Sequence, residues 1–587
     1  WNRSGVILWA AGLLLLALGR PSRADEAITS DRRLPKNTVV YLSARNVNEL
    51  KADWPKSLFA QMFADESLAA FRDQIAKKFD EFSEEVRENL GMNVADLWAV
   101  PQGEVAFAGL MMPDSTVNAA LLIDFGDQEE AVHKLLEKHA EHSQQNDSTR
   151  REEEFEDTKI VFYEKSAEGE DDTNAKKLVE TDAYFIKDRC LVLAENPATL
   201  KEILKRWDGK QENTFAENET YQYIVEKCRE EGTDGRPDVV WYLDPVTILK
   251  AVAAENADKL GQAGAAVNLL PMLGIDNFKG LGGVVDFVKG DYDIVARTLV
   301  MVEQTPQGLN NLFQFELTAQ APPKWLSSEW TAYSSYNWNA AKTYSAIEGL
   351  ADMFLGPGGL ATQLQKIAEN PATGGIHLKK DVFDQLSGTI HIAERESGDG
   401  DKSPEGTLIA VQIKKAAAIR SLMTKIVNLG VVKFNEREFQ GETLYEFNPL
   451  ALAGIAEDEE VPNWGIAVSD GHLMIATDVR LLERVLRGVG DGETLADSAA
   501  YKRVARRFPA KTAYISFSRP DVSMKSLFEM LKTGAEQVSD TLGDFDFSVL
   551  PDAEVLKKYL PPAGGYMEKD TRGYKITHFS LRGESSP

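Results

Sequence analysis

The residues most capable of chemistry in this sequence are carboxylates gathered in two short acidic runs. The first run contains Glu168, Glu170, Asp171 and Asp172, and the second contains Glu457, Asp458, Glu459 and Glu460. Carboxylate oxygens are the ligands that calcium prefers, so each run is a candidate calcium site. Neither run has the Asp-x-Asp-x-Asp-Gly spacing that prearranges a calcium loop. Because such runs usually form solvated loops, we favour that interpretation and keep calcium binding as the alternative.

Histidine and cysteine offer fewer options. His139 and His142 could share one face of a helix, but two imidazoles without a third ligand do not make a zinc site. Cys190 and Cys228 are the only cysteines, which excludes a disulfide-dense scaffold. In an oxidising compartment these two could form one disulfide, and the sequence leaves that pairing open because it depends on geometry. Neither thiol has the neighbouring His of a nucleophile, so catalysis by cysteine is disfavoured.

Known catalytic motifs are absent. The chain contains no Gly-x-Ser-x-Gly elbow, no phosphate loop ending in Gly-Lys-Ser or Gly-Lys-Thr, and no His-Glu-x-x-His. The segment 280–283, Gly-Leu-Gly-Gly, lacks the third glycine of a dinucleotide fingerprint. A pair of carboxylates could still hydrolyse a glycoside, but nothing singles out two among 92 acids. The sequence therefore names no catalytic residue and no cofactor.

The elements that must position these residues are a mixture of helices and short strands. Apolar residues recur every three or four positions over 68–90, which predicts a long helix. Short β-favouring runs occur at 161–163, 184–186 and 191–193. Asp470-Gly471 lies between two apolar runs and predicts a tight hairpin. Helices are expected at 197–206 and 478–487. This succession predicts an α+β fold of antiparallel sheets with helices packed on one face.

An internal repeat carries most of the information. Residues 188–194 align with 470–476 at an offset of 282, residues 216–224 align with 496–504 at 280, and residues 96–107 align with 381–392 at 285. Offsets this constant over hundreds of residues indicate a duplicated globular unit, because solenoid repeats have periods of only about 20 to 50 residues. The alignment places His391 opposite Ala106 and His472 opposite Cys190, which predicts that both histidines lie on strands.

The repeat defines the expected domains. The first half spans 34–320, with subunits of about 34–235 and 236–320. The second half spans 330–587, with subunits of about 330–509 and 510–587. Between them, 321–329 is the expected linker, because Pro322-Pro323 cannot continue a helix or a central strand.

The N-terminal residues predict export. Arg3 is followed by an apolar run of about 15 residues and by Ser22-Arg23-Ala24, which is the pattern of a secretory signal peptide over 1–24. Retention of this segment as an anchor is the alternative. We expect a periplasmic or extracellular protein of the cell envelope, with no membrane span in the mature chain. With 65 basic and 92 acidic residues the net charge is −27, which disfavours nucleic acid and anionic lipid as partners.

Several segments resemble a known family. They are Leu34-Pro35-Lys36-Asn37-Thr38 through Leu42, Pro323-Lys324-Trp325 through Trp338, Leu273-Gly274-Ile275-Asp276, and Leu281-Gly282-Gly283. In these segments the chain resembles large exported bacterial proteins that carry a domain of unknown function. The resemblance implies a strand and helix that precede a loop ending in Gly and a hairpin. It brings no activity and no site residues.

The sequence as a whole favours a non-enzymatic binding or structural-interaction protein. A large repeated scaffold without a catalytic constellation is the reason, and the partner would be an unknown protein or envelope component. An extracytoplasmic hydrolase using carboxylates is one alternative, and a calcium-dependent adhesion or assembly protein is another. Buried carboxylates clustered in one half without an equivalent in the other would favour the hydrolase.

Overall fold

The computed structural model describes residues 28–90, 99–145, 148–165, 180–229, 236–256, 271, 273–303, 308–312, 314–396, 404–450, 461–533 and 545–583. The chain divides into two compact units. Unit 1 comprises residues 1–269 and 279–301, and unit 2 comprises residues 270–278 and 302–587. The segment 321–329 lies within the range of unit 2. None of the helices among the described residues is both long and apolar enough to cross a bilayer.

The described residues of unit 1 form ten strands and several α-helices. The strands are β1 Thr38–Ala44, β2 Val105–Met111, β3 Val117–Asp124, β4 Thr149–Phe155, β5 Thr158–Lys165, β6 Glu180–Lys187, β7 Cys190–Ala194, β8 Val239–Leu243, β9 Phe278–Lys289 and β10 Tyr292–Val302. The described helices are α2 Val47–Asp53, α3 Leu58–Ala64, α4 Ala69–Leu90, α6 Glu129–Gln145, α7 Pro197–Leu204, α8 Glu219–Cys228 and α9 Pro245–Glu255.

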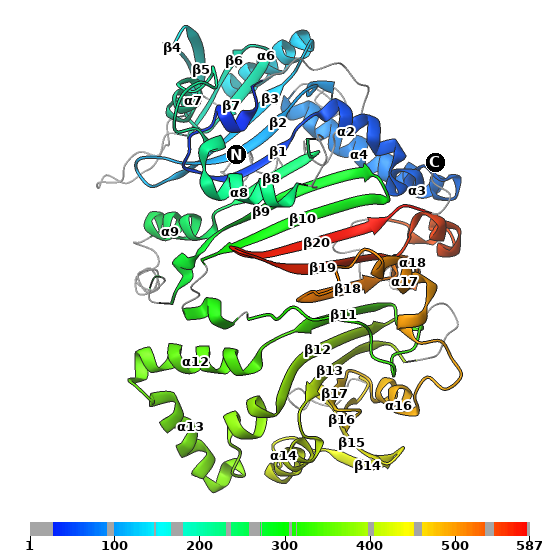
Figure 1. The fold of residues 1–587 in the computed structure, drawn as a ribbon. Helices are drawn as coiled ribbons and strands as arrows, with labels where there is room; N and C mark the ends of the chain where they lie inside the picture. Colours follow the sequence, from blue (N-terminus) through cyan, green and yellow to red (C-terminus); the bar gives the residue numbers. More distant parts are fainter. Residues whose placement is uncertain are drawn as a thin grey trace. The chain divides into compact units, whose positions relative to one another are not determined.

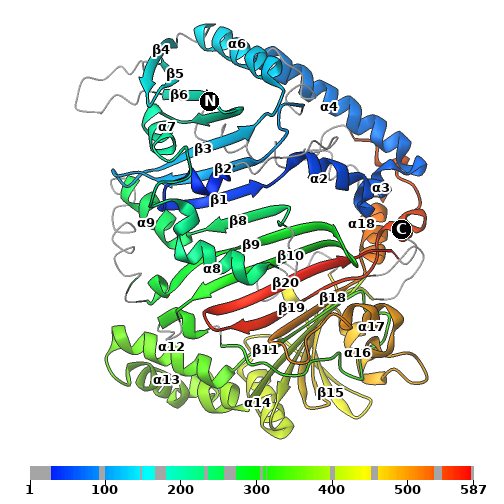
Figure 2. The ribbon, with the colours of Figure 1, turned by 45° about the horizontal axis from the view of Figure 1, so that its top comes forward.

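The strands of unit 1 pair in the order β4-β5-β6-β7-β3-β2-β1-β8-β9-β10. Figure 2 shows the run from β3 to β10. Neighbouring strands are antiparallel, as the short β-favouring runs in the sequence predict. Asp188 and Arg189 join β6 to β7 with φ of 48° and 61°, so both turn residues are left-handed, as a type I′ hairpin requires.

In the described part of unit 2 there are likewise ten strands. They are β11 Ala332–Asn337, β12 Leu386–Arg395, β13 Gly406–Ile413, β14 Asn435–Phe439, β15 Glu442–Phe447, β16 Trp464–Ser469, β17 His472–Ala476, β18 Tyr514–Ser518, β19 Ala563–Asp570 and β20 Gly573–Leu581. The described helices are α12 Ala340–Leu355, α13 Gly359–Glu369, α14 Ala416–Leu429, α16 Val479–Arg487, α17 Ala499–Ala505 and α18 Pro520–Thr533.

The strands of unit 2 pair in the order β14-β15-β16-β17-β13-β12-β11-β18-β19-β20 (Figure 1). Each strand of unit 1 therefore has a counterpart ten numbers later at the same place in the ladder. The predicted hairpin is confirmed, because Asp470 and Gly471 join β16 to β17 with φ of 47° and 72°. His391 and His472 lie on β12 and β17, as expected.

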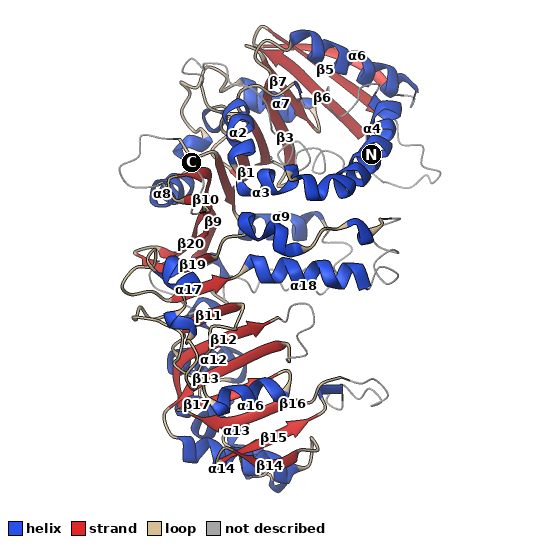
Figure 3. Cartoon of the chain, turned by 90° about the vertical axis from the view of Figure 1, so that its right-hand side faces the viewer, coloured by secondary structure: helices blue, strands red, loops and turns tan. Residues whose placement is uncertain are grey.

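Helices cover both faces of the sheet in unit 1, so the prediction of helices on one face was wrong (Figure 3). Ala106, Leu122 and Val192 pack with α7 and α8, whereas their neighbours in sequence, Val105, Leu121 and Leu191, pack with α2 and α6. Successive strand residues point to opposite faces, so these two clusters lie on opposite sides. Because the strands are apolar on both faces, a single helical layer would leave half of that surface exposed.

Candidate functional site

A cavity of about 440 Å³ lies at one end of the sheet of unit 1. Antiparallel pairing brings the C-terminal ends of β1, β3 and β9 beside the N-terminal ends of β2, β7 and β8. The residues at those six ends therefore line the cavity together; they are Arg45, Asp124, Lys289, Glu104, Cys190 and Asp238. They are scattered over 245 positions, from 45 to 289, and only the sheet brings them together.

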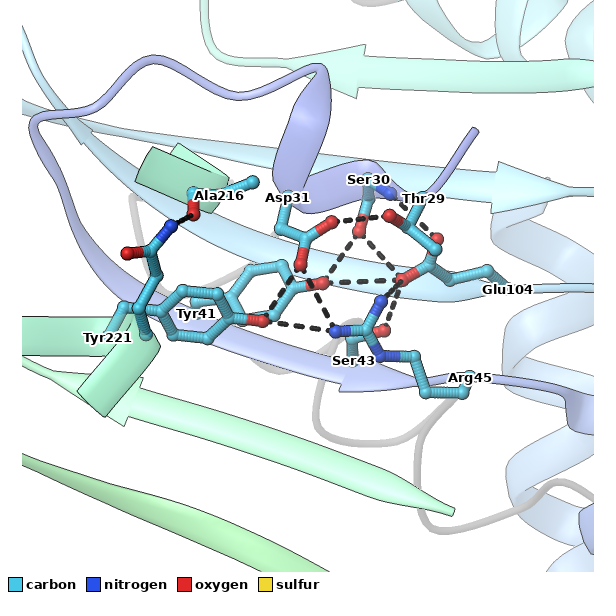
Figure 4. A network of polar contacts seen from close by, with 10 residues as sticks. Thr29, Ser30, Asp31, Tyr41, Ser43, Arg45, Glu104, Ala216 and Tyr221 are labelled. Atoms are coloured by element: carbon cyan, nitrogen blue, oxygen red, sulfur yellow. Dashed lines mark hydrogen bonds and ion pairs between the residues drawn. The ribbon is translucent and has the colours of Figure 1, made fainter. Parts of the chain in front are cut away.

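Arg45 is the centre of a buried polar network (Figure 4). Its guanidinium Nη2 lies 3.2 Å from Oδ2 of Asp31, and its Nη1 lies 3.5 Å from Oε1 of Glu104. Nη2 also donates to the hydroxyl of Tyr221 at 3.0 Å. The side chains of Arg45, Asp31 and Glu104 are only 10 to 15% exposed. One cation thus balances two buried carboxylates. The carboxylate oxygens that Arg45 does not reach must accept hydrogen bonds from hydroxyl groups instead.

Hydroxyl and amide donors surround Glu104. Its Oε1 accepts from Ser43 Oγ at 2.5 Å, from Ser30 Oγ at 2.8 Å and from the Tyr41 hydroxyl at 3.2 Å, and its Oε2 accepts from the Ser30 amide at 2.7 Å. Asp31 likewise accepts from the hydroxyls of Thr29 and Tyr221. These bonds tie the segment 29–31 to β1 and β2. The donors around Asp31 favour the ionised form of its carboxylate.

The electrostatics of the network follow from burial opposed by Arg45. Burial alone would raise the pKa of Asp31, but the Arg45 guanidinium and the hydroxyls of Thr29 and Tyr221 lower that pKa below its ordinary value. Burial raises the pKa of the Tyr41 phenol well above its usual range. Asp31 is thus an ion and Tyr41 a neutral donor at neutral pH, so neither is poised to exchange a proton there.

Asp238 has a different environment. Burial raises the pKa of this carboxyl to about 6, although the bond that its Oδ2 accepts from the Phe287 amide at 2.7 Å and the nearby Lys289 both lower it. Its backbone oxygen accepts from the Arg45 amide at 3.0 Å, which places Asp238 beside the network. A carboxyl with a pKa near neutrality in a cavity is the type of group that can act as a general acid or base.

Residues of the β6–β7 turn and Arg33 also line the cavity. The Asp188 carboxylate accepts from Trp207 Nε1 at 2.7 Å, and Arg33 stacks on the same indole with its Cζ 3.9 Å from the ring centroid. Arg33 Nε is buried without a hydrogen-bond partner. Burial raises the pKa of the Cys190 thiol to about 12 despite the nearby Arg33, so the thiol is inert at neutral pH.

At the places of unit 2 that match Arg45, Glu104, Asp124 and Asp238, the structure has uncharged residues. The Arg45 amide donates to Asp238 and the Asn337 amide donates to Ala513, each at 3.0 Å, which identifies Asn337 as the counterpart of Arg45 and Ala513 as that of Asp238. Thr389 pairs with Asn337, at the place of Glu104 in unit 1. Gln412 pairs with His472, as Asp124 pairs with Cys190.

Aromatic rings gather at this place in unit 2. Trp325 packs edge-on against His391 and His472, with centroids 6.3 and 5.7 Å away, and the two imidazole centroids are 5.4 Å apart. Tyr333 hydrogen-bonds to His391 Nδ1 at 2.9 Å. Unit 1 has Ala106 and Cys190 where the two histidines lie. Small side chains at these two positions leave room that imidazole rings occupy in unit 2.

Among the predicted site residues that the structure describes, Cys190 lines this cavity. Glu168, Glu170, Asp171, Asp172, Glu457, Asp458, Glu459 and Glu460 lie outside the described residues, as do the signal segment 1–24 and residues 96–98. Cys190 and Cys228 are both buried in the same core cluster, on β7 and at the end of α8, and no disulfide joins them. Within the described ranges, no three His, Cys, Asp or Glu side chains are grouped to hold a metal ion.

His139 packs as a core-edge residue. Its ring lies edge-on to Tyr163 with centroids 5.1 Å apart, and burial lowers its pKa. This packing agrees with the interpretation of the residue as the edge of an apolar helix face.

Reasoning from the sequence missed Asp31, Arg45, Glu104, Asp124 and Asp238. Each is a single charged residue at the end of a strand or beside one, without a local motif. A usable signal was present in the repeat, because the aligned position of Glu104 in the second half is Thr389. The counterpart of Asp124, Gln412, is identified by strand pairing in the structure. Charges present in one half and absent from the other would have pointed to this end of the sheet.

The chain matches no protein-family model, no curated protein and no solved structure.

Proposed function

We propose that the protein is an exported binding protein of the cell envelope, and that unit 1 binds a small polar ligand in the cavity at the strand ends. The observation that carries this proposal is the difference between the units. The same place in the ladder has Arg45, Glu104, Asp124 and Asp238 in unit 1 and uncharged side chains in unit 2. A volume of about 440 Å³ falls within the range typical of small-molecule sites, about 300 to 1,000 Å³.

Binding is favoured over catalysis by the state of the carboxylates. The oxygens of Asp31 and Glu104 accept bonds from Arg45 and from hydroxyl groups, which is the arrangement of a rigid, preorganised wall. A general acid and base acting as a pair need pKa values that are pushed apart around the working pH. The pKa of Asp238 is raised toward neutrality, and one carboxyl of this kind does not make such a pair.

The proposal is tested by a thermal-shift screen of small polar compounds against the wild type and Glu49→Trp. Glu49 lies at the cavity with an exposed side chain on α2, so an indole there blocks access without disturbing the core. Glu226→Trp, at an exposed site on α8, is the matched control. We expect compounds that raise the Tm of the wild type and of Glu226→Trp but not of Glu49→Trp. A screen in which no compound shows this pattern refutes the proposal.

A hydrolase is the second candidate, because Asp238 combines a pKa of about 6 with a place in the cavity. Buried carboxylates in one unit without equivalents in the other also favour it. The assay is hydrolysis of chromogenic esters, glycosides and phosphate esters by the wild type and Asp238→Asn. Turnover by the wild type that Asp238→Asn abolishes establishes the hydrolase, and we expect none.

Calcium-dependent adhesion or assembly is the third candidate, and it rests on the two acidic runs alone. Calorimetric titration with calcium is the direct test. Heat of binding together with a rise in Tm would support it, and we expect neither.

We also infer that the two units arose by tandem duplication. The support is the sequence repeat together with the identical order of the ten strands in each unit. Export rests on the N-terminal signal pattern and on the resemblance to large exported bacterial proteins. In this view unit 2 keeps the scaffold, whereas unit 1 keeps or has gained the charged cavity.

A further inference from the structure

The cations that line the cavity differ in whether they already have an anionic partner. Arg45 is balanced by Asp31 and Glu104. Arg33, Arg189, Arg236 and Lys289 also line the cavity, and no ion pair to any of these four occurs within the described residues. Unpaired cations beside a cavity are favourable only if water or a ligand supplies the missing acceptors.

The acids of the cavity already have donors. Glu104 accepts four hydrogen bonds, Asp188 accepts from the Trp207 indole, Asp124 accepts from the Gly126 amide and Asp238 accepts from the Phe287 amide. Glu49 is exposed. The groups of the cavity that still lack hydrogen-bond partners are therefore mainly the N–H donors of these four cations. A ligand that satisfies them must be an acceptor, and an oxyanion is the most effective one.

Arg33 and Arg189 line the cavity together with Asp188 and Cys190. Arg33 is held flat on Trp207 and keeps a buried Nε without a partner. Arg189 is exposed and lies in a left-handed turn position, with φ of 61°. The left-handed conformation costs a non-glycine residue about 1 kcal/mol, so a glycine at position 189 would be more favourable for the backbone. The counterpart in the unit 2 hairpin is Gly471, which has no side chain.

We propose, resting on the proposed function, that the ligand of the unit 1 cavity carries an oxyanion, either a carboxylate or a phosphate, which Arg33 and Arg189 bind. The surrounding carboxylates Asp124, Asp188 and Asp238 would repel further negative charge, so a ligand with one or two charges fits better than a polyanion. The net charge of −27 repels free anions, so attraction of an anion must come from cations at a defined place.

The test is isothermal titration calorimetry of the full chain at constant ionic strength with three probes, namely inorganic phosphate, succinate and uncharged glycerol. Arg189→Gly is the decisive variant, because it copies the Asp-Gly turn of unit 2 and relieves the left-handed strain. We expect it to fold at least as stably as the wild type. Arg33→Gln is the second variant, and Arg151→Gln, an exposed arginine of β4 paired with Glu164 outside the cavity, is the control.

We expect phosphate or succinate, but not glycerol, to bind the wild type and Arg151→Gln, and at least fivefold weaker binding to Arg189→Gly and Arg33→Gln. Which of the two anions binds more tightly distinguishes a phosphate from a carboxylate ligand. Equal anion affinity in all four proteins, or no anion binding at all, overturns the inference. If neutral compounds still bind and Glu49→Trp abolishes their binding, the cavity keeps its proposed function and only the oxyanion is excluded.

Discussion

At the scale of residues, Arg45 is the side chain on which the cavity wall depends. Its removal leaves the carboxylates of Asp31 and Glu104 buried without a counterion. Uncompensated buried charge is among the few mechanisms that destabilise a protein by several kcal/mol.

We predict that Arg45→Met lowers the free energy of unfolding of unit 1 by about 3 to 5 kcal/mol at pH 7, because removal of one partner from a buried ion pair typically has that effect. Urea unfolding is the measurement. The triple variant Asp31→Asn, Arg45→Met, Glu104→Gln carries no charge and should recover much of the loss. If the triple variant is as unstable as the single one, loss of packing rather than unbalanced charge is the cause.

His391 gives a second prediction at this scale. Burial, helped by the neighbouring His472, lowers its pKa from 6.5 to about 4. The unfolded chain therefore binds a proton between pH 6.5 and 4 that the folded chain does not, so stability is full above pH 6.5 and falls as the pH drops toward 4. The shift corresponds to about 3 kcal/mol. His391→Ala, which copies Ala106 of unit 1, should lose less stability than the wild type between pH 7 and pH 4.5.

The control for this measurement is His133→Ala, an exposed histidine of α6 in unit 1. We expect it to keep the pH dependence of the wild type. A His391→Ala protein with the unchanged pH dependence would show that His391 is not the group that titrates.

At the scale of elements, paired glycines decide how closely neighbouring strands approach. Gly282 and Gly283 of β9 lie opposite Tyr242 and Trp241 of β8, and Gly564 and Gly565 of β19 lie opposite Phe517 and Ser516 of β18. A Cβ on Gly283 would lie 2.0 Å from the Arg297 backbone oxygen. Close packing of backbone thus requires the pair Gly282-Gly283.

We predict that Gly283→Ala destabilises the protein by at least about 2 kcal/mol, because backbone cannot move aside as a flexible side chain can. Gly349→Ala in α12 is the contrast, since a Cβ there meets no atom within 4 Å. Alanine is the better helix former, so this variant should be neutral or more stable by up to about 1 kcal/mol. Thermal unfolding of both variants measures the difference, and equal destabilisation would contradict the steric explanation.

At the scale of the whole molecule, the division into two compact units predicts how the protein unfolds. In each unit the described residues form ten strands and pack a buried core of their own. Units with separate cores commonly unfold in separate steps.

We expect two calorimetric transitions, and we expect Gly283→Ala to lower one of them and Gly565→Ala to lower the other. A Cβ on Gly565 would lie 2.5 Å from His578 Nδ1 and 2.8 Å from the Thr577 backbone oxygen, so its effect belongs to unit 2. Differential scanning calorimetry is the measurement. A single transition that both variants shift equally would show that the units unfold together.

The sequence by itself determined what depends on neighbours along the chain. The hairpin at Asp470-Gly471, the helices that begin near 197 and 478, and the β-strand positions of His391 and His472 were predicted correctly because turn dihedrals and side-chain periodicity are local properties. The placing of helices on one face was predicted wrongly, because the runs of apolar residues do not reveal which helix covers which side.

Only the tertiary structure decided where the chemistry lies. Arg45, Glu104, Asp124 and Asp238 come from four different strand ends, and antiparallel register alone places them around one cavity. Strand pairing places Cys190 of unit 1 and His472 of unit 2 at the same position of their ladders. The small thiol leaves space at this position in unit 1, and the imidazole ring fills that space in unit 2. Contacts between residues far apart in sequence are set by packing of the whole sheet, and no local pattern records them.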